Sequence, residues 1–375
     1  MRLSDIFKKS GKPPPVENVV QPGASRNNSA GAPAQAQPPV AAPQISHPAS
    51  PFSAKTIPAP LSAEQVYTAS IIEIKQILSS VQRAAPFDAP LSAVENITNL
   101  ILSGDRDLLF LADRATPDVY IYGHSVNVCI LSVFLASSLK LEREKLLRIG
   151  YSAFLHDIGM ARFMELAQKN AKFSGAELAQ IRKHTHAAQE VLKLLRTLDT
   201  GLRNSIATVI SQTHERNNGS GYPQGLKGDE IDYAARVIAI ADVYEALTHP
   251  RSYRTRLIPH EGIKAIIGYA DSLFDTNMVK AFVENISLYP PGSYVRLNTD
   301  EIARVTGINK GLPTRPEVRV IVDPSGRRTP ARAVTNLSVT PMLFVKEPVD
   351  ETKITFQDKK IGIELKAMRW WVKGL

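Results

Sequence analysis

The apolar residues of this chain recur at helical spacing from Ser62 to about residue 285. The segment Ser62-Ala63-Glu64-Gln65 is typical of a capped helix start, and the apolar positions after it lie three and four residues apart. The same period predicts further helices over residues 93–103, 124–139, 142–159, 175–197, 202–213, 234–248, 260–272 and 276–285. This region contains no convincing strand pattern. We therefore expect an all-α helical bundle.

The pattern changes after Pro290-Pro291. Short β-like runs over residues 294–297, 303–306 and 318–322 predict strands, and residues 323–326 (Asp-Pro-Ser-Gly) predict a turn. We expect a small C-terminal β module at residues 288–345, followed by a tail at 346–375 to which we assign no fold. The helical region divides into N-terminal helices at 62–115 and a main domain at 116–287.

Residues 1–61 differ from the periodic region in composition. Residues 11–60 contain 12 of the 26 prolines, with Ala, Gln and Ser between them and almost no large apolar side chains. Such a segment buries too little apolar surface to offset the entropy lost on ordering. We expect a disordered Pro/Ala-rich leader, in which Leu3, Ile6 and Phe7 form either a short docking motif or part of an unstructured end.

The net charge of +9 suggests nucleic acid as a partner, but its distribution argues against this. Residues 61–290 hold 24 Lys and Arg against 25 Asp and Glu, so the helical region is nearly neutral. The positive excess lies in residues 1–60 and 291–375, where solvated basic ends explain it. We expect no binding to polymeric nucleic acid.

The cysteine content and the apolar runs indicate in which cellular compartment the protein is expected. Cys129 is the only cysteine, which excludes an internal disulfide and a Cys-rich zinc site and suits a reducing environment. The first residues contain no signal-peptide core, and the longest apolar stretch, 126–139, is shorter than the roughly 20 residues of a membrane span. We expect a soluble, cytoplasmic protein without membrane insertion.

Seven of the eight histidines lie between residues 124 and 260. Four of them and two aspartates fall on apolar helical faces, whereas His186 is offset from that face. The six inward-facing residues are His124, His156, Asp157, His184, His214 and Asp242. Each alone is more often a hydrogen-bonded core residue than a ligand. Together, on separate helices, they favour a metal ion in a helical bundle, and mixed imidazole and carboxylate ligands suit Fe or Mn.

Two further features accompany these residues. The loop at residues 217–226 (Asn-Asn-Gly-Ser-Gly-Tyr-Pro-Gln-Gly-Leu) contains Gly219 and Gly221, which permit tight turns and the close approach of a ligand. Beyond Asp242, Arg251 and Arg254 could reach a phosphate or a guanine edge, or form surface ion pairs.

His156-Asp157 followed by Gly221-Tyr222-Pro223, in this order and spacing, resembles the HD-GYP family of cyclic-di-GMP phosphodiesterases. The resemblance covers roughly residues 96–322 and implies an HD-type helical bundle. It implies that His124, His156, Asp157 and Asp242 hold one metal, with Asp157 bridging to a second that His184 and His214 help to bind. It also implies hydrolysis of a 3′–5′ phosphodiester at two divalent ions. Arg251, Arg254 and Tyr222 would contact cyclic-di-GMP.

The resemblance also suggests that the loop containing Gly219, Gly221, Tyr222 and Pro223 contacts a partner such as a diguanylate cyclase domain.

The chain departs from the family pattern at several positions. Thr213 stands where members usually have a second histidine, and Met160 where they usually have a lysine. Asn218 and Glu245 stand where members commonly have Asp, and Tyr120 where members with a third metal have Glu, so we expect no third metal. These departures leave three hypotheses open: a cyclic-di-GMP phosphodiesterase with two metals or only one, a module that binds the dinucleotide or a partner with little turnover, and a phosphohydrolase of another nucleotide.

Overall fold

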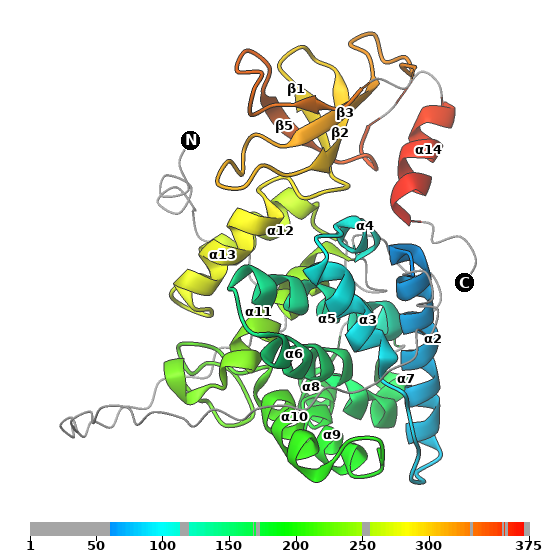
Figure 1. Cartoon of the computed structure of the whole chain (residues 1–375), viewed down its shortest axis with the longest axis vertical. Helices are drawn as coiled ribbons and strands as arrows, with labels where there is room; N and C mark the ends of the chain where they lie inside the picture. The colour runs from blue at the N-terminus through cyan, green and yellow to red at the C-terminus, as the bar shows by residue number, and fades with distance from the viewer. Residues whose placement is uncertain are drawn as a thin grey trace, which may run out of the picture.

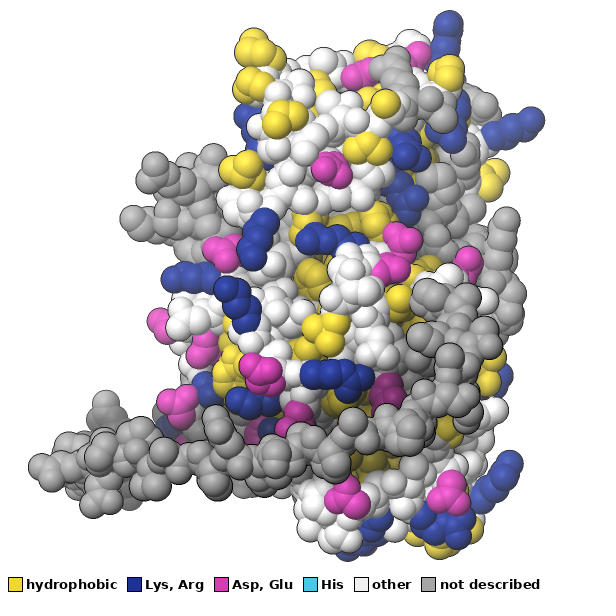
Figure 2. Space-filling model, in the orientation of Figure 1, with side chains coloured by type: hydrophobic (Ala, Val, Ile, Leu, Met, Phe, Trp, Pro, Cys, Tyr) yellow, Lys and Arg dark blue, Asp and Glu magenta, His cyan; other side chains and the backbone are white. Residues whose placement is uncertain are grey.

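The computed structural model describes residues 61–112, 120–167, 169, 173–249, 256–330, 333–354, 356 and 359–370. Residues 1–60 of the expected leader, together with Arg251 and Arg254, lie outside these residues. A helical body carries a sheet at one end, and α14 lies beside that sheet (Figure 1). Lys and Arg side chains intermingle with Asp and Glu over the helical part of the face in Figure 2, as the near balance of charge in residues 61–290 predicts.

The helices of the body, in chain order, are α2 (Ala63–Gln82), α3 (Ser92–Leu102), α4 (Asp107–Ala112), α5 (Tyr120–Ser138), α6 (Arg143–Leu155), η1 (Ile158–Phe163), α7 (Met164–Ala167), α8 (Gly175–Ile181), α9 (His184–Leu192), α10 (Thr200–Gln212), η2 (Gly228–Glu230), α11 (Tyr233–Thr248), α12 (Pro259–Gly268) and α13 (Thr276–Ile286). The C-terminal part contains β1 (Tyr294–Leu297), β2 (Ile302–Gly307), β3 (Glu317–Val322), β4 (Thr335–Asn336), β5 (Val345–Val349) and α14 (Lys359–Trp370).

Helix α5 lies at the centre of the body and packs against α2, α3, α4, α6, α11 and α13. It is apolar on nearly all sides because neighbouring helices surround it, as is typical of a core helix. It is the one helix among the described residues that is long and apolar enough to cross a membrane, yet 78% of its apolar window is buried inside the protein. Helix α2 begins at the capping box of Ser62 and Gln65, as predicted.

Two of the predicted helices are interrupted. The helix expected over 142–159 ends at Leu155, and the one expected over 175–197 is divided between α8 and α9. Both expectations were wrong because the apolar stripe continues across each break, so periodicity alone does not reveal it. Gly159 of η1 lies at a close contact with α9. A Cβ at this position would lie 2.0 Å from the carbonyl oxygen of His184, so only glycine lets η1 approach α9 this closely.

The sheet is antiparallel, in the order β4-β3-β2-β1-β5, and includes the three predicted strands. Its alternating side chains separate into two faces. Val295 and Ala303 belong to the core shared with the helices, whereas Tyr294 and Ile302 pack with Leu365 of α14. Strand β5, apart from Val345, and helix α14 fall in the range 346–375 expected to be a tail. The sequence of β5, Val-Lys-Glu-Pro-Val, lacks clear alternation.

Candidate metal centre

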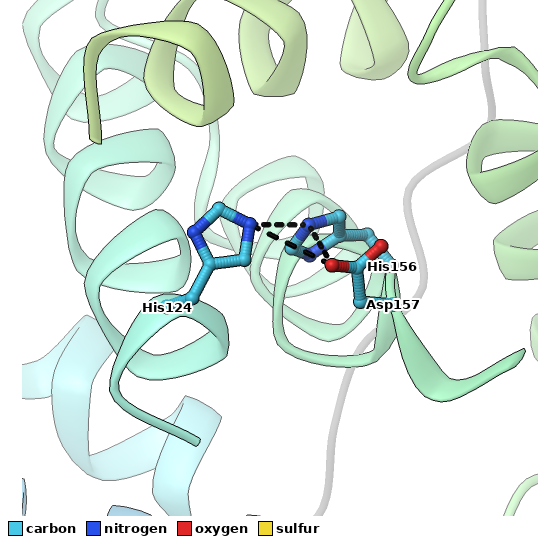
Figure 3. A group of neighbouring side chains, drawn as sticks. All are labelled: His124, His156 and Asp157. Atoms are coloured by element: carbon cyan, nitrogen blue, oxygen red, sulfur yellow. Dashed lines mark hydrogen bonds and ion pairs between the residues drawn. The ribbon is translucent and has the colours of Figure 1, made fainter. Parts of the chain in front are cut away.

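The turn between α6 and η1 places His156 and Asp157 opposite His124 of α5 (Figure 3). The Nε2 atoms of His124 and His156 are 3.2 Å apart, and Asp157 Oδ2 lies 3.7 Å from the first and 3.6 Å from the second. These three ligand atoms lie within 4.8 Å of one another. We call His124, His156 and Asp157 the inner group.

The other carboxylate oxygen of Asp157 faces two further histidines. Its Oδ1 lies 3.3 Å from His184 Nε2, and His184 Nε2 is 3.0 Å from His214 Nε2. Ligand atoms of these three residues also lie within 4.8 Å of one another. We call Asp157, His184 and His214 the outer group. Asp157 is thus shared, with one oxygen directed to each group.

Asp242 of α11 lies between the two groups. Its Oδ1 is 3.4 Å from His124 Nε2, and its Oδ2 is 3.7 Å from His214 Nδ1. The structure therefore brings together all six residues that the sequence singled out, and it leaves His186 exposed on the far side of α9. It also places Asp242 against both groups, where the family resemblance implied only the first.

Hydrogen bonds determine which ring nitrogens of the inner group face the centre. Nδ1 of His156 lies 2.8 Å from the carbonyl oxygen of Ala153, which only accepts, so this nitrogen carries the hydrogen. Nδ1 of His124 lies 2.5 Å from Oε2 of Glu245. Both Nε2 atoms are then acceptors, and acceptors 3.2 Å apart need a positive charge between them. A proton or a metal ion provides that charge, and the donor set fits a metal.

Glu245, one turn after Asp242 on α11, is the centre of a buried hydrogen-bond network. Its Oε2 accepts from His124 Nδ1 and, at 2.6 Å, from the hydroxyl of Tyr120. Its Oε1 accepts from the side-chain amide of Asn127 at 3.2 Å. His249, four residues further along, lies 3.4 Å from the same oxygen. The network fixes the ring orientation of His124 in the way that acceptors behind metal-binding histidines do.

The outer group is less constrained. His184 Nδ1 lies 2.7 Å from the carbonyl oxygen of Ile181, so its Nε2 is an acceptor. His214 can satisfy this acceptor by donating from its own Nε2, so the pair is stable without a cation. Thr213 is fully buried and its hydroxyl donates to the carbonyl of Ile210, 3.0 Å away. The hydroxyl is therefore engaged with its own helix.

The charges of the cluster shift several pKa values. Burial acts to lower the pKa of His124, but Glu245 and Asp242 outweigh it and raise that pKa to about 10. Burial acts to raise the pKa of Asp157, but the surrounding histidines, His156 first, lower it to about 2. Burial and the neighbouring His184 lower the pKa of His214 to about 3. Asp157 is thus charged and His214 neutral at neutral pH, the forms that bind metals.

Hydrogen bonds hold the Gly-Tyr-Pro loop to Glu215, the residue after His214. The carboxylate of Glu215, which is buried, accepts from the backbone N–H groups of Gln224, Gly225 and Leu226 at 2.7, 3.2 and 3.1 Å. A Cβ on Gly221 would lie 2.4 Å from the Cα of Glu215, so the loop crosses this backbone too closely for any other residue. These contacts hold Tyr222 against the cluster.

Tyr222 stacks on His214, with ring centroids 4.9 Å apart and an interplanar angle of 17°. Gly219 has a φ of +80°, which supports the turn before it, and Pro223 is exposed. Met160 is buried in η1.

Sequence reasoning missed the roles of Glu245 and Glu215. The spacing of Glu245 from Asp242, one helical turn on the same face, was a usable signal. Glu215 gave none, because it binds backbone N–H groups of a loop rather than side chains at a recognisable spacing.

The helical body thus encloses imidazole and carboxylate donors from separate segments, a donor set that could hold a metal ion. Residues 116–278 match the family of HD domains, and residues 294–357 match the KOW domain associated with HD domains. The HD-domain match and the cyclic di-GMP phosphodiesterases among the relatives support the HD-GYP resemblance that the sequence motifs predicted.

The curated relatives of this chain include phosphodiesterases of cyclic dinucleotides. A cyclic di-GMP phosphodiesterase of Pseudomonas aeruginosa is 32% identical over 60% of this chain and 54% of its own length. The cyclic di-GMP phosphodiesterase PdeB of Borreliella burgdorferi is 28% identical over 53% and 52%. The 3′3′-cGAMP-specific phosphodiesterase 3 of Vibrio cholerae is 26% identical over 48% and 38%. The chain thus spans about half the length of the first two and less of the third.

Proposed function

We propose that the protein is a metal-dependent phosphodiesterase that hydrolyses cyclic di-GMP at the inner and outer groups. The observation that carries this proposal is the shared carboxylate of Asp157, with Oδ1 directed to His184 and Oδ2 to His124 and His156. One carboxylate between two histidine pairs is an arrangement that two neighbouring divalent ions could share. The names of the relatives supply the substrate class.

The assignment of ligands follows the geometry. His124, His156, Asp157 and Asp242 would hold one ion, and Asp157, His184 and His214 the other, with Asp242 also near the second. Fe or Mn suits this mixed donor set. When bound, a pair of such ions lowers the pKa of a water molecule and neutralises charge on the phosphoryl group. The low pKa of Asp157, about 2, keeps its carboxylate charged for both ions across the physiological range.

The residues around the cluster would orient the dinucleotide. Tyr222 and His214 are partly exposed, whereas His156 is fully buried, so the outer group is the side that a substrate can approach. Arg251 and Arg254 would contact its phosphates or guanine edges, since guanidinium groups bind both.

A second candidate function rests on Thr213. Its buried hydroxyl is bonded to Ile210, so residue 213 adds no ligand to the three residues of the outer group. Met160 supplies no cation. A module with one ion would bind the dinucleotide with little turnover, and its Gly-Tyr-Pro loop, in which Pro223 is exposed, would contact a partner such as a diguanylate cyclase domain.

Metal content and turnover, measured on the same anaerobically purified sample, test the proposal. We expect two equivalents of Mn²⁺ or Fe²⁺ per chain and hydrolysis of cyclic di-GMP, with 3′3′-cGAMP as the comparison substrate. His184→Ala should abolish turnover and His186→Ala, on the exposed side of the same helix, should not. Tight binding of cyclic di-GMP without turnover would favour the second candidate function. Faster cleavage of 3′3′-cGAMP than of cyclic di-GMP would make 3′3′-cGAMP the substrate instead.

A further inference from the structure

His214 differs from the other three histidines of the cluster in how its ring is held. Nδ1 of His156 and of His184 faces a backbone carbonyl, and Nδ1 of His124 faces Glu245. Among the described residues, Nδ1 of His214 has no such hydrogen bond, and the nearest carboxylate oxygen, of Asp242, is 3.7 Å away. Its side chain is also 13% exposed, compared with 3% for His184. The ring is held through Nε2, which faces His184, but neither an acceptor for Nδ1 nor full burial fixes its other side.

Ring contacts through Tyr222 take the place of an acceptor at Nδ1 of His214. Tyr222 lies on the ring of His214 with nearly parallel planes, and the guanidinium carbon of Arg182 lies 4.9 Å from the centroid of the Tyr222 ring. A cation over an aromatic face is attracted by the negative charge of that face. The guanidinium of Arg182 has no carboxylate partner within the described part of the chain, so nothing there draws it away from Tyr222.

The position of Arg182 in the chain relates this stack to the outer group. Arg182 is the C-cap of α8, and His184 begins α9 two residues later. The short segment 182–184 thus provides both a member of the outer group and the cation that rests on Tyr222. Helix α8 is itself anchored, because Ser174 and Glu177 form a capping box and Glu177 pairs with Lys169 at 2.6 Å.

We propose that Arg182 and Tyr222 form a clamp that orients His214, and that this clamp sets the affinity of the outer group for its metal ion. The inference rests on the proposed metal site, but not on the identity of the nucleotide. Arg182 acts through Tyr222 and is a positioning residue.

Isothermal titration of the full-length apoprotein with Mn²⁺ tests the clamp. Arg182→Met keeps the length of the side chain and removes its charge. We expect it to weaken the second equivalent of Mn²⁺ by about tenfold or more, the usual effect of losing a residue that supports a ligand, and to leave the first unchanged. Arg182→Lys should restore much of the affinity. The matched control is Lys183→Met, which removes the same charge from the exposed neighbouring residue.

A second pair of variants tests the ring itself. Tyr222→Phe keeps both stacking faces and should bind the second Mn²⁺ like the parent, whereas Tyr222→Leu should resemble Arg182→Met. Thermal unfolding of each apoprotein shows whether it is folded at the temperature of the titration.

The outcomes separate the clamp from the proposed function. Unchanged binding of both equivalents in folded Arg182→Met would overturn the clamp, as would a parent that binds only one equivalent. A rise in KM with no change in Mn²⁺ binding would also overturn it, because Arg182 would then contact the substrate. A parent that binds two equivalents but cleaves no cyclic di-GMP would instead refute the proposed function.

Discussion

The inner and outer groups share Asp157 but differ in how their histidines are held. In the inner group, both Nδ1 atoms have fixed acceptors and both side chains are almost completely buried. In the outer group, His184 has such an acceptor, while His214 is partly exposed and rests on an aromatic ring. A rigid site presents its ligands at a smaller cost in entropy, so we expect the inner group to bind its ion more tightly.

At the proposed metal site, one cluster would therefore combine a tightly held ion with a more readily exchanged one. The buried network around Glu245 supports the first, and a loop supports the second. The exposed side is where a phosphate would meet the ions.

Asp157→Ala removes the ligand that both groups share. We expect both ions to be lost and turnover to fall by about 10³-fold or more, since metal stabilisation of the phosphoryl group is worth several kcal/mol. Metal content by mass spectrometry and hydrolysis of cyclic di-GMP measure the two effects. A variant as active as the parent, in a preparation free of contaminating hydrolase, would refute the assignment of Asp157 as the shared ligand.

Gly159→Ala should disturb the outer group through the backbone. The added Cβ would meet the carbonyl oxygen of His184 at 2.0 Å and the amide nitrogen of Ala188 at 2.7 Å, which pushes α9 away from η1. We expect a loss of about 1–3 kcal/mol in the free energy of unfolding, measured in urea, and loss of the second equivalent of metal. Gly175→Ala is the control, because nothing lies within 4 Å of its added Cβ.

Glu245→Gln should affect the inner group. The amide keeps the size of the side chain but removes the negative charge that faces Nδ1 of His124. We expect the first equivalent of Mn²⁺ to bind about 10- to 100-fold more weakly, with a smaller change in the second. If titration instead showed the second equivalent to be the weakened one, the two groups would not be separable in this way.

Thr213→His should strengthen the outer group. A second imidazole next to His214 offers a ligand that the threonine hydroxyl, bonded to Ile210, does not. We expect the affinity for the second equivalent to rise by about tenfold, the smallest of the four effects. Thr213→Val removes only the hydroxyl and should leave both equivalents unchanged. Loss of the second ion in that variant would mean that the hydroxyl is itself a ligand.

Much of the fold and the membership of the cluster could be predicted from the sequence. The 3.6-residue period places His124 and Asp242 on buried faces because a helix repeats its environment every turn. The same reasoning excluded His186, which is exposed. The interruption before His156 and the division at Arg182 were not predictable, because an apolar stripe looks the same whether or not the helix breaks beneath it.

The sequence by itself determined which residue types are available, on which faces they lie and which family they indicate. Only the tertiary structure decided that Asp242 lies against both groups, that Glu245 fixes the ring of His124, and that the clamp rests on His214. The physical reason is the separation along the chain of the residues in contact. Periodicity reports the environment within a few residues, whereas these contacts join segments as far apart as Tyr120 and Glu245, and packing of whole helices sets such distances.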